Sequence, residues 1–377
     1  MKWRFLSDDG VSAAAGLAAD EALMSTHARS AAPAFDATLR LYSYRAHCAL
    51  VGRYQNLSAE LDEASCSSLD VEVGRRPTGG GAILMGPAQL GVAVATRSTP
   101  ELTPRAQLRV FSRGVVAGLA ELGIEPRFRS KNDLEVDGRK IAGLGLHLDA
   151  DGAVLFHASV LVDLDMELML RVLNIPGAKV SDKAVRDIGD RVTTVSRELG
   201  RPRAASDVRP AFRRGFETAF EIDAVDGTLT GPEISRRDRL IEEKYAHPEW
   251  THQRSPRRDA RGSATLKTPE GLLRVYVGRH GDVMNSVLLC GDFNALPPGV
   301  ARLEAALRWS RVDPERIHAL AEQNLESTDL GVGPRDVAEA VIAAATHARE
   351  IESAHPVRRE GACYAPTPDG RDEGSKR

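Results

Sequence analysis

Along the first two thirds of the chain, short strand-like runs of apolar residues alternate with longer helix-like runs. Residues 12–30 have a helical composition, with Leu17, Ala18, Leu23 and Met24 near one face of the expected helix. Short apolar runs predict strands at 38–44, 49–54, 71–76 and in the second half of 82–96.

The pattern then becomes one helix followed by a β-meander. Pro104 can begin a helix that runs to about Leu122, because proline suits the first helical position. Residues 125–162 contain four apolar segments separated by Asn-Asp, Asp-Gly and Asp-Ala-Asp-Gly turns, which predicts neighbouring strands. Further helices are predicted near 166–173, 183–199, 207–220 and 232–245.

A polar, Arg-rich stretch at 247–262 interrupts the regular pattern and predicts a linker. Two strands around a His-Gly-Asp turn follow at 272–293, and helices are predicted at 299–309, 313–324 and 334–353. We therefore expect an α/β (α+β) chain with a mixed sheet. Its predicted parts are a large domain at 1–246, the linker at 247–262, a small α+β domain at 263–354 and a disordered tail at 355–377.

Composition narrows the function classes only slightly. The chain has 377 residues and a formal net charge of −3, which argues against a strongly basic nucleic-acid binder. No apolar run is long enough to span a membrane, and charges interrupt the first ten residues too early for a secretory signal. Cys48, Cys66, Cys290 and Cys363 form no CxxC or zinc-like spacing, so we expect reduced thiols and a cytoplasmic protein.

The stretch RRPTGGGAIL at 75–84 is the first candidate for chemistry. Three consecutive glycines carry a large entropic cost, so they indicate a positive φ angle or a close backbone approach. Bare N–H groups beside Arg75 and Arg76 suit a phosphate or a carboxylate, although a tight turn beside a surface arginine pair explains the stretch as well. Neither the Walker pattern nor GxGxxG is present.

Three further residues could take part in chemistry. Lys140 is one of only eight lysines, and it opens an apolar, glycine-containing strand where its ammonium could reach a ligand or lie in solvent. Asp133 could bind a metal or form an Asx turn. Alternation places His157 on one strand face with Leu155 and Ser159, as either a hydrogen-bonded core residue or a catalyst.

These features follow one another in a recognisable order. The order is RR-x-[ST]-GGGA, then N-D, then G-[RK]-K-I-x-G, then H-[GA]-x-[LV]-L-V-[DN], which resembles the lipoate-protein ligases of the biotin/lipoate ligase superfamily. The resemblance covers about residues 2–325 and includes GDF at 291–293, similar to the family's C-terminal accessory domain. Other agreeing stretches are 17–24, 39–44, 51–56 and 244–255.

The resemblance implies roles for particular residues. Lys140 would be the catalytic residue that contacts the ligand carboxylate and the α-phosphate, and Asp133 would lie beside the adenylate and a Mg²⁺ ion. Gly145 and His157 would flank the nucleotide or the acyl chain. The acyl-adenylate pocket would be lined by Arg76, Thr78, Gly79, Gly80, Gly81 and Ile83.

The implied activity has two steps and needs ATP and Mg²⁺. Lipoate or octanoate would attack ATP to give an acyl-AMP, and a lysine of a lipoyl carrier protein would then accept the acyl group. Because carboxylate and phosphate are both anionic, the first step needs fixed positive charge and N–H donors, which Lys140 and the glycine loop offer. One branch of the family serves lipoate-binding carriers of sulfur oxidation, and this chain is a candidate for that branch. In this family the accessory domain is expected to move between the two steps.

Several positions depart from the family pattern around the expected ligand. Met85-Gly86 stands where His-Asp is usual, and Gln89 stands where an asparagine is usual. KIAGLG replaces KI[SA]GSA, and FHA replaces the middle of HHG. Acyl specificity or carrier identity is therefore expected to differ from that of the housekeeping enzymes.

Two alternatives stay open. Acyltransferases of the superfamily form a thioester on a cysteine, but this chain has no cysteine between residues 67 and 289. A non-catalytic lipoate-binding or carrier-binding module is favoured by Met85-Gly86 and opposed by the retention of Lys140, Asp133, Arg76 and the glycines.

Overall fold

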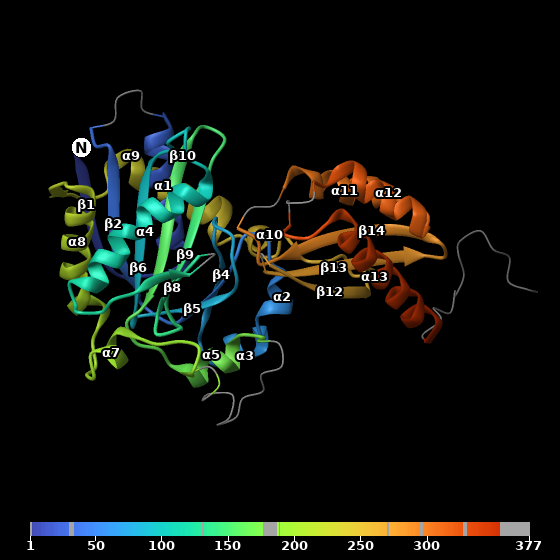
Figure 1. Cartoon of the computed structure of the whole chain (residues 1–377), viewed down its shortest axis with the longest axis horizontal. Coiled ribbons are helices and arrows are strands. Elements are labelled where there is room, and N and C mark those ends of the chain that lie inside the picture. Colours follow the sequence, from blue (N-terminus) through green and yellow to red (C-terminus); the bar gives the residue numbers. More distant parts are fainter. Residues whose placement is uncertain are drawn as a thin grey trace, which may run out of the picture.

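The protein consists of a large α/β unit and a smaller α+β unit that lie side by side (Figure 1). The computed structural model describes residues 2–29, 34–129, 132–175, 187, 189–269, 271–294, 297–326 and 330–354. The predicted tail at 355–377 and residues 183–186 and 188 of the helix predicted near 183–199 lie outside these residues. In the described remainder of that segment, Val192 forms a β-bridge with Lys140 and the named helix is limited to Val195–Glu198, so the long helix prediction was wrong there.

A mixed sheet forms the centre of the large unit. Within the described residues it has eight strands in the order β11-β1-β2-β6-β10-β9-β8-β7. β1 pairs in parallel with both β2 and β11, whereas all other neighbours are antiparallel. The mixed α/β fold expected from the sequence is confirmed. The strands are β1 (Trp3–Val11), β2 (Ala37–Tyr44), β6 (Gln89–Arg97), β7 (Arg127–Arg129), β8 (Asp133–Val136), β9 (Arg139–Leu148), β10 (Ala153–Leu161) and β11 (Ala224–Asp226).

Two helical layers cover the two faces of this sheet (Figure 1). On one face α4 (Pro104–Ala120) and α8 (Ala205–Phe220) pack over a core that includes Phe111, Phe156 and Phe212. On the other face lies α1 (Ala13–Arg29), with α9 (Gly231–Leu240) and the π-helix η1 (Ile241–Tyr245) against it. Alternation along β10 directs Phe156 to the first core and His157 toward the α1 side.

A second, small sheet stands beside α1 and carries the glycine loop. Its order is β4-β3-β5, with β3 (Cys48–Val51) in the middle, β4 (Glu72–Arg75) parallel to it and β5 (Ile83–Met85) antiparallel. The loop 76–82 joins β4 to β5, and it lines a pocket together with residues of β9 and β10 of the large sheet. Short helices complete this region: α2 (Leu57–Glu60), α3 (Glu63–Ser68), α5 (Met166–Val172) and α7 (Val195–Glu198).

The smaller unit has its own sheet and its own apolar core. The sheet order is β12-β13-β14, and three helices cover one face through residues such as Leu303, Ile317 and Val341. The predicted boundaries at 246, 262 and 354 stay a prediction. The elements are β12 (Gly262–Thr268), β13 (Gly271–His280), β14 (Val283–Gly291), α11 (Pro298–Leu307), α12 (Pro314–Asn324) and α13 (Pro334–Ala354).

The sequence pattern did not predict β1, β5, β11 or β12, and the two longest of these, β1 and β12, were missed for the same reason. The second half of β1 contains Asp8 and Asp9, whose carboxylates bind Arg40 and Arg209, so apolar and polar residues do not alternate there. β12 is an edge strand whose outward residues are exposed or half-buried, so it resembles a continuation of the linker. A short helix, α10 (Pro248–Thr251), also forms within the predicted linker. Among the described residues, no helix combines the length and apolar character needed to cross a bilayer.

Candidate active site

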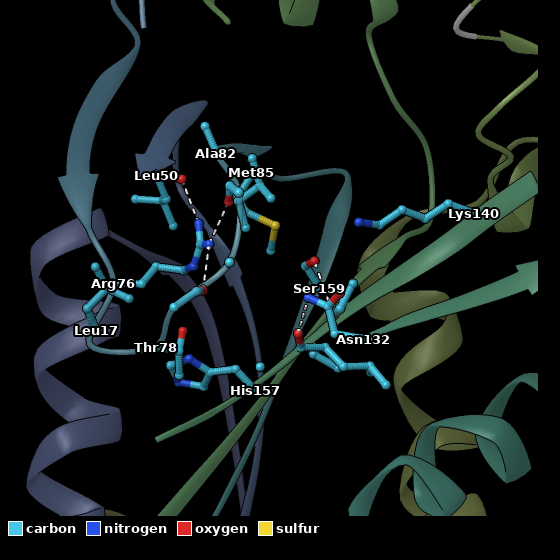
Figure 2. Close-up of a pocket in the computed structure, with 18 of the residues that line it drawn as sticks. Leu17, Leu50, Arg76, Thr78, Ala82, Met85, Asn132, Lys140, His157 and Ser159 are labelled. Atoms are coloured by element: carbon cyan, nitrogen blue, oxygen red, sulfur yellow. Dashed lines mark hydrogen bonds between the residues drawn. The ribbon is translucent and has the colours of Figure 1, made fainter. Parts of the chain in front are cut away.

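A pocket opens between the glycine loop, helix α1 and the strands β9 and β10 (Figure 2). The structure brings together nine of the ten site residues predicted from the sequence, all except Asp133, along its wall. The lining residues are Leu17, Tyr42, Tyr44, Leu50, Arg76, Thr78, Gly79, Gly80, Gly81, Ala82, Ile83, Met85, Asn132, Lys140, Gly143, Leu144, Gly145, His157, Ala158 and Ser159.

Arg76 holds the glycine loop in shape. Its guanidinium donates hydrogen bonds to the carbonyl oxygens of Leu50 at 2.6 Å, Gly81 at 2.7 Å and Gly79 at 3.3 Å. Burial lowers the pKa of Arg76 to about 10, so the side chain stays charged at neutral pH. Arg76 therefore fixes the loop and leaves a positive charge beneath it.

Two of the three glycines face the smaller unit. The Gly80 N–H, at a φ of +89°, donates to the carbonyl oxygen of Phe293 at 2.9 Å. A Cβ atom on Gly79 would lie 1.9 Å from that same oxygen. Close packing between the units therefore accounts for these glycines, in agreement with the positive φ or close backbone approach expected from the sequence. Gln55 Nε2 also donates to Asp292 Oδ1 at 2.6 Å across this boundary.

Lys140 and Asp133 form an ion pair at the mouth of the pocket. Lys140 Nζ lies 2.7 Å from Asp133 Oδ1, and the two side chains are 33% and 26% exposed. The backbone of Lys140 is fixed by hydrogen bonds with the Arg191 carbonyl and the Thr193 N–H. Its ammonium is thus held near solvent on a rigid strand, where a ligand anion could displace Asp133.

Asp133 does not itself line the pocket, and no group of three or more potential metal-ligating side chains occurs in the part of the chain that the structure describes. Mg²⁺ usually binds through one or two carboxylates together with substrate phosphates and water. A single aspartate at the pocket mouth fits such an ion if ATP supplies the other ligands. It does not fit a cage made by the protein alone.

His157 lies at the inner end of the pocket, where its ring contacts the buried carboxylate of Asp20. Its Nε2 lies 3.0 Å from Asp20 Oδ2, and the Tyr42 hydroxyl donates to the same oxygen at 3.0 Å. Arg40 donates to Asp20 Oδ1 at 2.7 Å and to Asp8 at 2.6 Å. Burial alone would raise the pKa of Asp20, but the Arg40 charge and the His157 hydrogen bond outweigh it, so the pKa lies below its usual value.

The departures from the family pattern have local consequences. Met85 is buried and adds a thioether to the apolar part of the pocket wall. A Cβ atom on residue 86 would lie 2.5 Å from His47 Cδ2, so glycine fits the space that this histidine leaves. Gln89 donates to the Asp163 carbonyl at 2.6 Å and thus supports the end of β10.

Sequence reasoning left several wall residues unassigned. Leu17, Tyr42, Tyr44 and Leu50 come from a predicted helix and predicted strands without an assigned role, and Asn132 and Ser159 had none either. Asn132 directly precedes Asp133 and Ser159 shares a strand face with His157, so closeness to a predicted site residue was the available signal for these two.

The described cysteines do not line this pocket, although Cys48 pairs with the lining residue Met85 and shares an apolar cluster with it. Cys48, Cys66 and Cys290 are all buried, and none is among the lining residues. Burial raises the pKa of Cys66 to about 11 and that of Cys290 to about 12, so neither is a ready nucleophile.

Comparison with known proteins identifies the family. Residues 12–217 match the family described as "Lipoyl protein ligase A/B catalytic domain". The octanoyltransferase LipM of Symbiobacterium thermophilum is 30% identical over 273 residues, which cover 66% of this chain and 97% of that protein.

Two solved structures are also similar. The bi-partite lipoate protein ligase of Thermoplasma acidophilum, described together with its E2 lipoyl domain, has a TM-score of 0.60 and 29% identity, covering 67% of this chain and 96% of that one. A lipoate-protein ligase A bound with ATP has a TM-score of 0.58 and 26% identity, covering 67% and 99%. The resemblance inferred from the motifs is confirmed. The chain belongs to the lipoyl protein ligase A/B family of lipoate ligases and octanoyltransferases.

Proposed function

We propose that this protein is an ATP-dependent lipoate-protein ligase that activates lipoate or octanoate as an acyl-AMP and transfers the acyl group to a carrier lysine. The observation that carries this proposal is the position of Lys140, whose ammonium lies at the pocket mouth on a fixed strand, with the glycine loop on the facing wall. A similar ligase has been solved with ATP bound.

The first step joins two anions, and the pocket offers the charge that this requires. A carboxylate oxygen of the acid attacks the α-phosphorus of ATP, a new O–P bond forms, and pyrophosphate leaves with the electrons of the broken bond. Lys140 would draw the carboxylate and the α-phosphate together, and Arg76 would add positive charge from beneath the loop. Such fixed charges cost no reorganisation during the reaction.

The second step transfers the acyl group. The carrier lysine attacks the acyl carbonyl, the C–O bond to phosphate breaks, AMP leaves and the amine gives up a proton. A free lysine is mostly protonated at neutral pH, since its ordinary pKa is about 10.4. The nearby Lys140 charge would favour the neutral amine in the bound state.

The rest of the wall suits an acyl chain. Leu17, Leu50 and Met85 provide an apolar surface across from Lys140 (Figure 2), and Ile83 lines the same pocket. Mg²⁺, held by Asp133 together with ATP phosphates, would neutralise the pyrophosphate. The expected partner is a lipoyl carrier protein, in keeping with the E2 lipoyl domain named with the Thermoplasma ligase, and a carrier of sulfur oxidation is one candidate. A cytoplasmic location remains part of this proposal.

The test is an assay with purified full-length protein, ATP, Mg²⁺ and lipoate or octanoate, followed by mass spectrometry. We expect acyl-AMP without a carrier, and a carrier-lysine mass shift with AMP release when a lipoyl carrier is added. Binding of both substrates without acyl-AMP would contradict the proposal and favour a non-catalytic module.

A second candidate, octanoyl transfer without ATP, is favoured by the names of the curated relatives. It needs an acyl-enzyme nucleophile, and the three described cysteines are buried and are not among the lining residues of the pocket. Supplying an octanoyl thioester in place of octanoate and ATP separates the two candidates. Acylation of the carrier from the thioester alone, abolished by prior thiol alkylation, would establish the transferase and remove the ligase.

A further inference from the structure

The buried carboxylate of Asp20 holds two residues of the pocket wall at once. Asp20 is wholly buried on α1, and its Oδ2 contacts both His157 on β10 and Tyr42 on β2 at 3.0 Å. Its Oδ1 faces Arg40, which is itself buried and can only donate hydrogen bonds. One helix and two strands therefore meet at this side chain, which belongs to the family-like stretch 17–24 but had no role assigned from the sequence.

The charges around Asp20 determine which nitrogen of His157 carries its proton. An ionised carboxylate only accepts hydrogen bonds, so the His157 Nε2 facing it must donate one. Nδ1 makes no hydrogen bond with any described residue, and it is not among the buried atoms that lack a partner. Since the ring lines the pocket, Nδ1 is left open to it.

His157 lies at the end of the pocket that a ligand tail would reach. Figure 2 shows Lys140 and His157 on opposite sides of the pocket, with Ser159 between them. The pairing of β9 and β10 agrees, because Ser159 faces Gly143 near Lys140 and His157 faces Gly145 one step further on. Lys140 is one third exposed, whereas the His157 side chain is 10% exposed.

We propose that Asp20 is a positioning residue that keeps the His157 proton on Nε2. Nδ1 then faces the inner end of the pocket as a hydrogen-bond acceptor. An acid whose tail also carries an acceptor is therefore disfavoured as a substrate. The pocket then selects saturated or dithiolane-ended acids over acids with a carbonyl or carboxylate near the tail. This selection rests on the proposed function, whereas the position of the proton does not.

The substitution Asp20→Asn should reverse the arrangement. Arg40 offers only N–H groups, so the amide oxygen of the new side chain must face Arg40 and its NH₂ group must face Tyr42 and His157. His157 Nε2 then has to accept, and the neutral ring must carry its proton on Nδ1. The same ring would present a donor to the pocket where wild type presents an acceptor.

Nitrogen-15 NMR of histidine-labelled, ligand-free protein at pH 7.5 tests the first part, with His157→Gln identifying the signal among the ten histidines. We expect an Nε2–H ring in wild type, an Nδ1–H ring in Asp20→Asn, and an unchanged Nε2–H ring in Tyr42→Phe, the matched control that removes only the second donor. An Nδ1–H ring or a doubly protonated ring in wild type would overturn the proposal. The wild-type and Tyr42→Phe spectra decide this even if Asp20→Asn does not fold.

Competition between octanoate and 7-oxooctanoate in acyl-AMP formation tests the second part. We expect Asp20→Asn to raise the kcat/KM of the oxo acid relative to octanoate about fivefold over the wild-type ratio, the effect of one net hydrogen bond. An unchanged ratio in a variant whose proton has moved to Nδ1 would refute the selection. If wild type forms acyl-AMP from no acid, the proposed function fails, and the NMR result still decides the proton position.

Discussion

The two ends of the pocket each contain an ion pair, and the two pairs differ in almost every physical respect. Lys140 and Asp133 meet at the mouth, about one third and one quarter exposed, with one contact between them. Arg40 and Asp20 meet at the inner end, both essentially without solvent exposure, and share partners on three other side chains.

This difference separates a pair that a ligand can exchange from one that the fold requires. An exposed pair gains little from its own attraction, so an incoming anion can replace the aspartate at small cost. A buried charge cannot lose its partner without leaving an unsolvated ion behind. The mouth therefore suits binding and chemistry, and the inner end suits positioning.

The largest expected effect is on stability at the inner end. Asp20→Ala leaves Arg40 with one carboxylate, Asp8, beside the Gly16 carbonyl, and removes the carboxylate partner of His157. We expect a loss of about 3–5 kcal/mol in the free energy of unfolding, measured with urea. Tyr42→Phe, which removes one hydrogen bond to the same carboxylate, should cost only about 1 kcal/mol. Equal losses for the two variants would mean that the Asp20 charge is not what the fold needs.

Removal of the Lys140 ammonium at the pocket mouth should lower the rate of catalysis and leave stability unchanged. Lys140→Ala is expected to fold normally and to lose about 10²–10³-fold in acyl-AMP formation, as when one preorganised donor is removed from a transition state. The measurement is the ATP- and acid-dependent release of pyrophosphate and AMP, with Lys267→Ala on the smaller unit as a control. Normal AMP release by Lys140→Ala would remove Lys140 from its proposed role.

His147, which follows Gly145 on the same face of β9, gives a pH-dependent test of the inner end. Burial, followed by the charge of Arg53, lowers the pKa of His147 from 6.5 to about 4. Because the folded state holds the neutral ring, its contribution is present above pH 6.5 and is lost as the pH falls toward 4. We expect wild type to lose about 2 kcal/mol more than His147→Gln over that window. Parallel stability curves would show that His147 is freely protonated in the fold.

The smallest effect is expected from the mouth pair itself. Asp133→Asn should change the free energy of unfolding by less than about 1 kcal/mol, because the pair is exposed to solvent. The same variant should raise the Mg²⁺ concentration needed for half-maximal acyl-AMP formation. A stability loss as large as that of Asp20→Ala would erase the distinction between the two ends.

Much of the fold followed from local patterns. The β-meander and the long helices have apolar residues at strand or helix spacing, and the structure contains them. β1 and β12 were missed because their outward residues are charged or polar, so only pairing with neighbouring strands reveals them. Long-range pairing leaves no trace in the spacing of residues along one strand.

The candidate site also has a part that the sequence could predict and a part that it could not. Motif order was enough to select residues that the structure gathers along one pocket, from Arg76 to His157. Their catalytic roles stay predictions. The sequence could not indicate that Gly79 and Gly80 pack against Phe293, because that contact joins residues more than two hundred positions apart.

By itself, then, the sequence determined the family, the fold class and the chemical character of the pocket, since these depend on residue type and order. Only the tertiary structure decided which carboxylate is buried under the pocket and which remains at its mouth. Asp20 and Asp133 are the same residue type, but burial removes water from one and leaves it to the other. Because solvent sets the strength of every charge interaction, that difference separates a fixed positioning group from an exchangeable one.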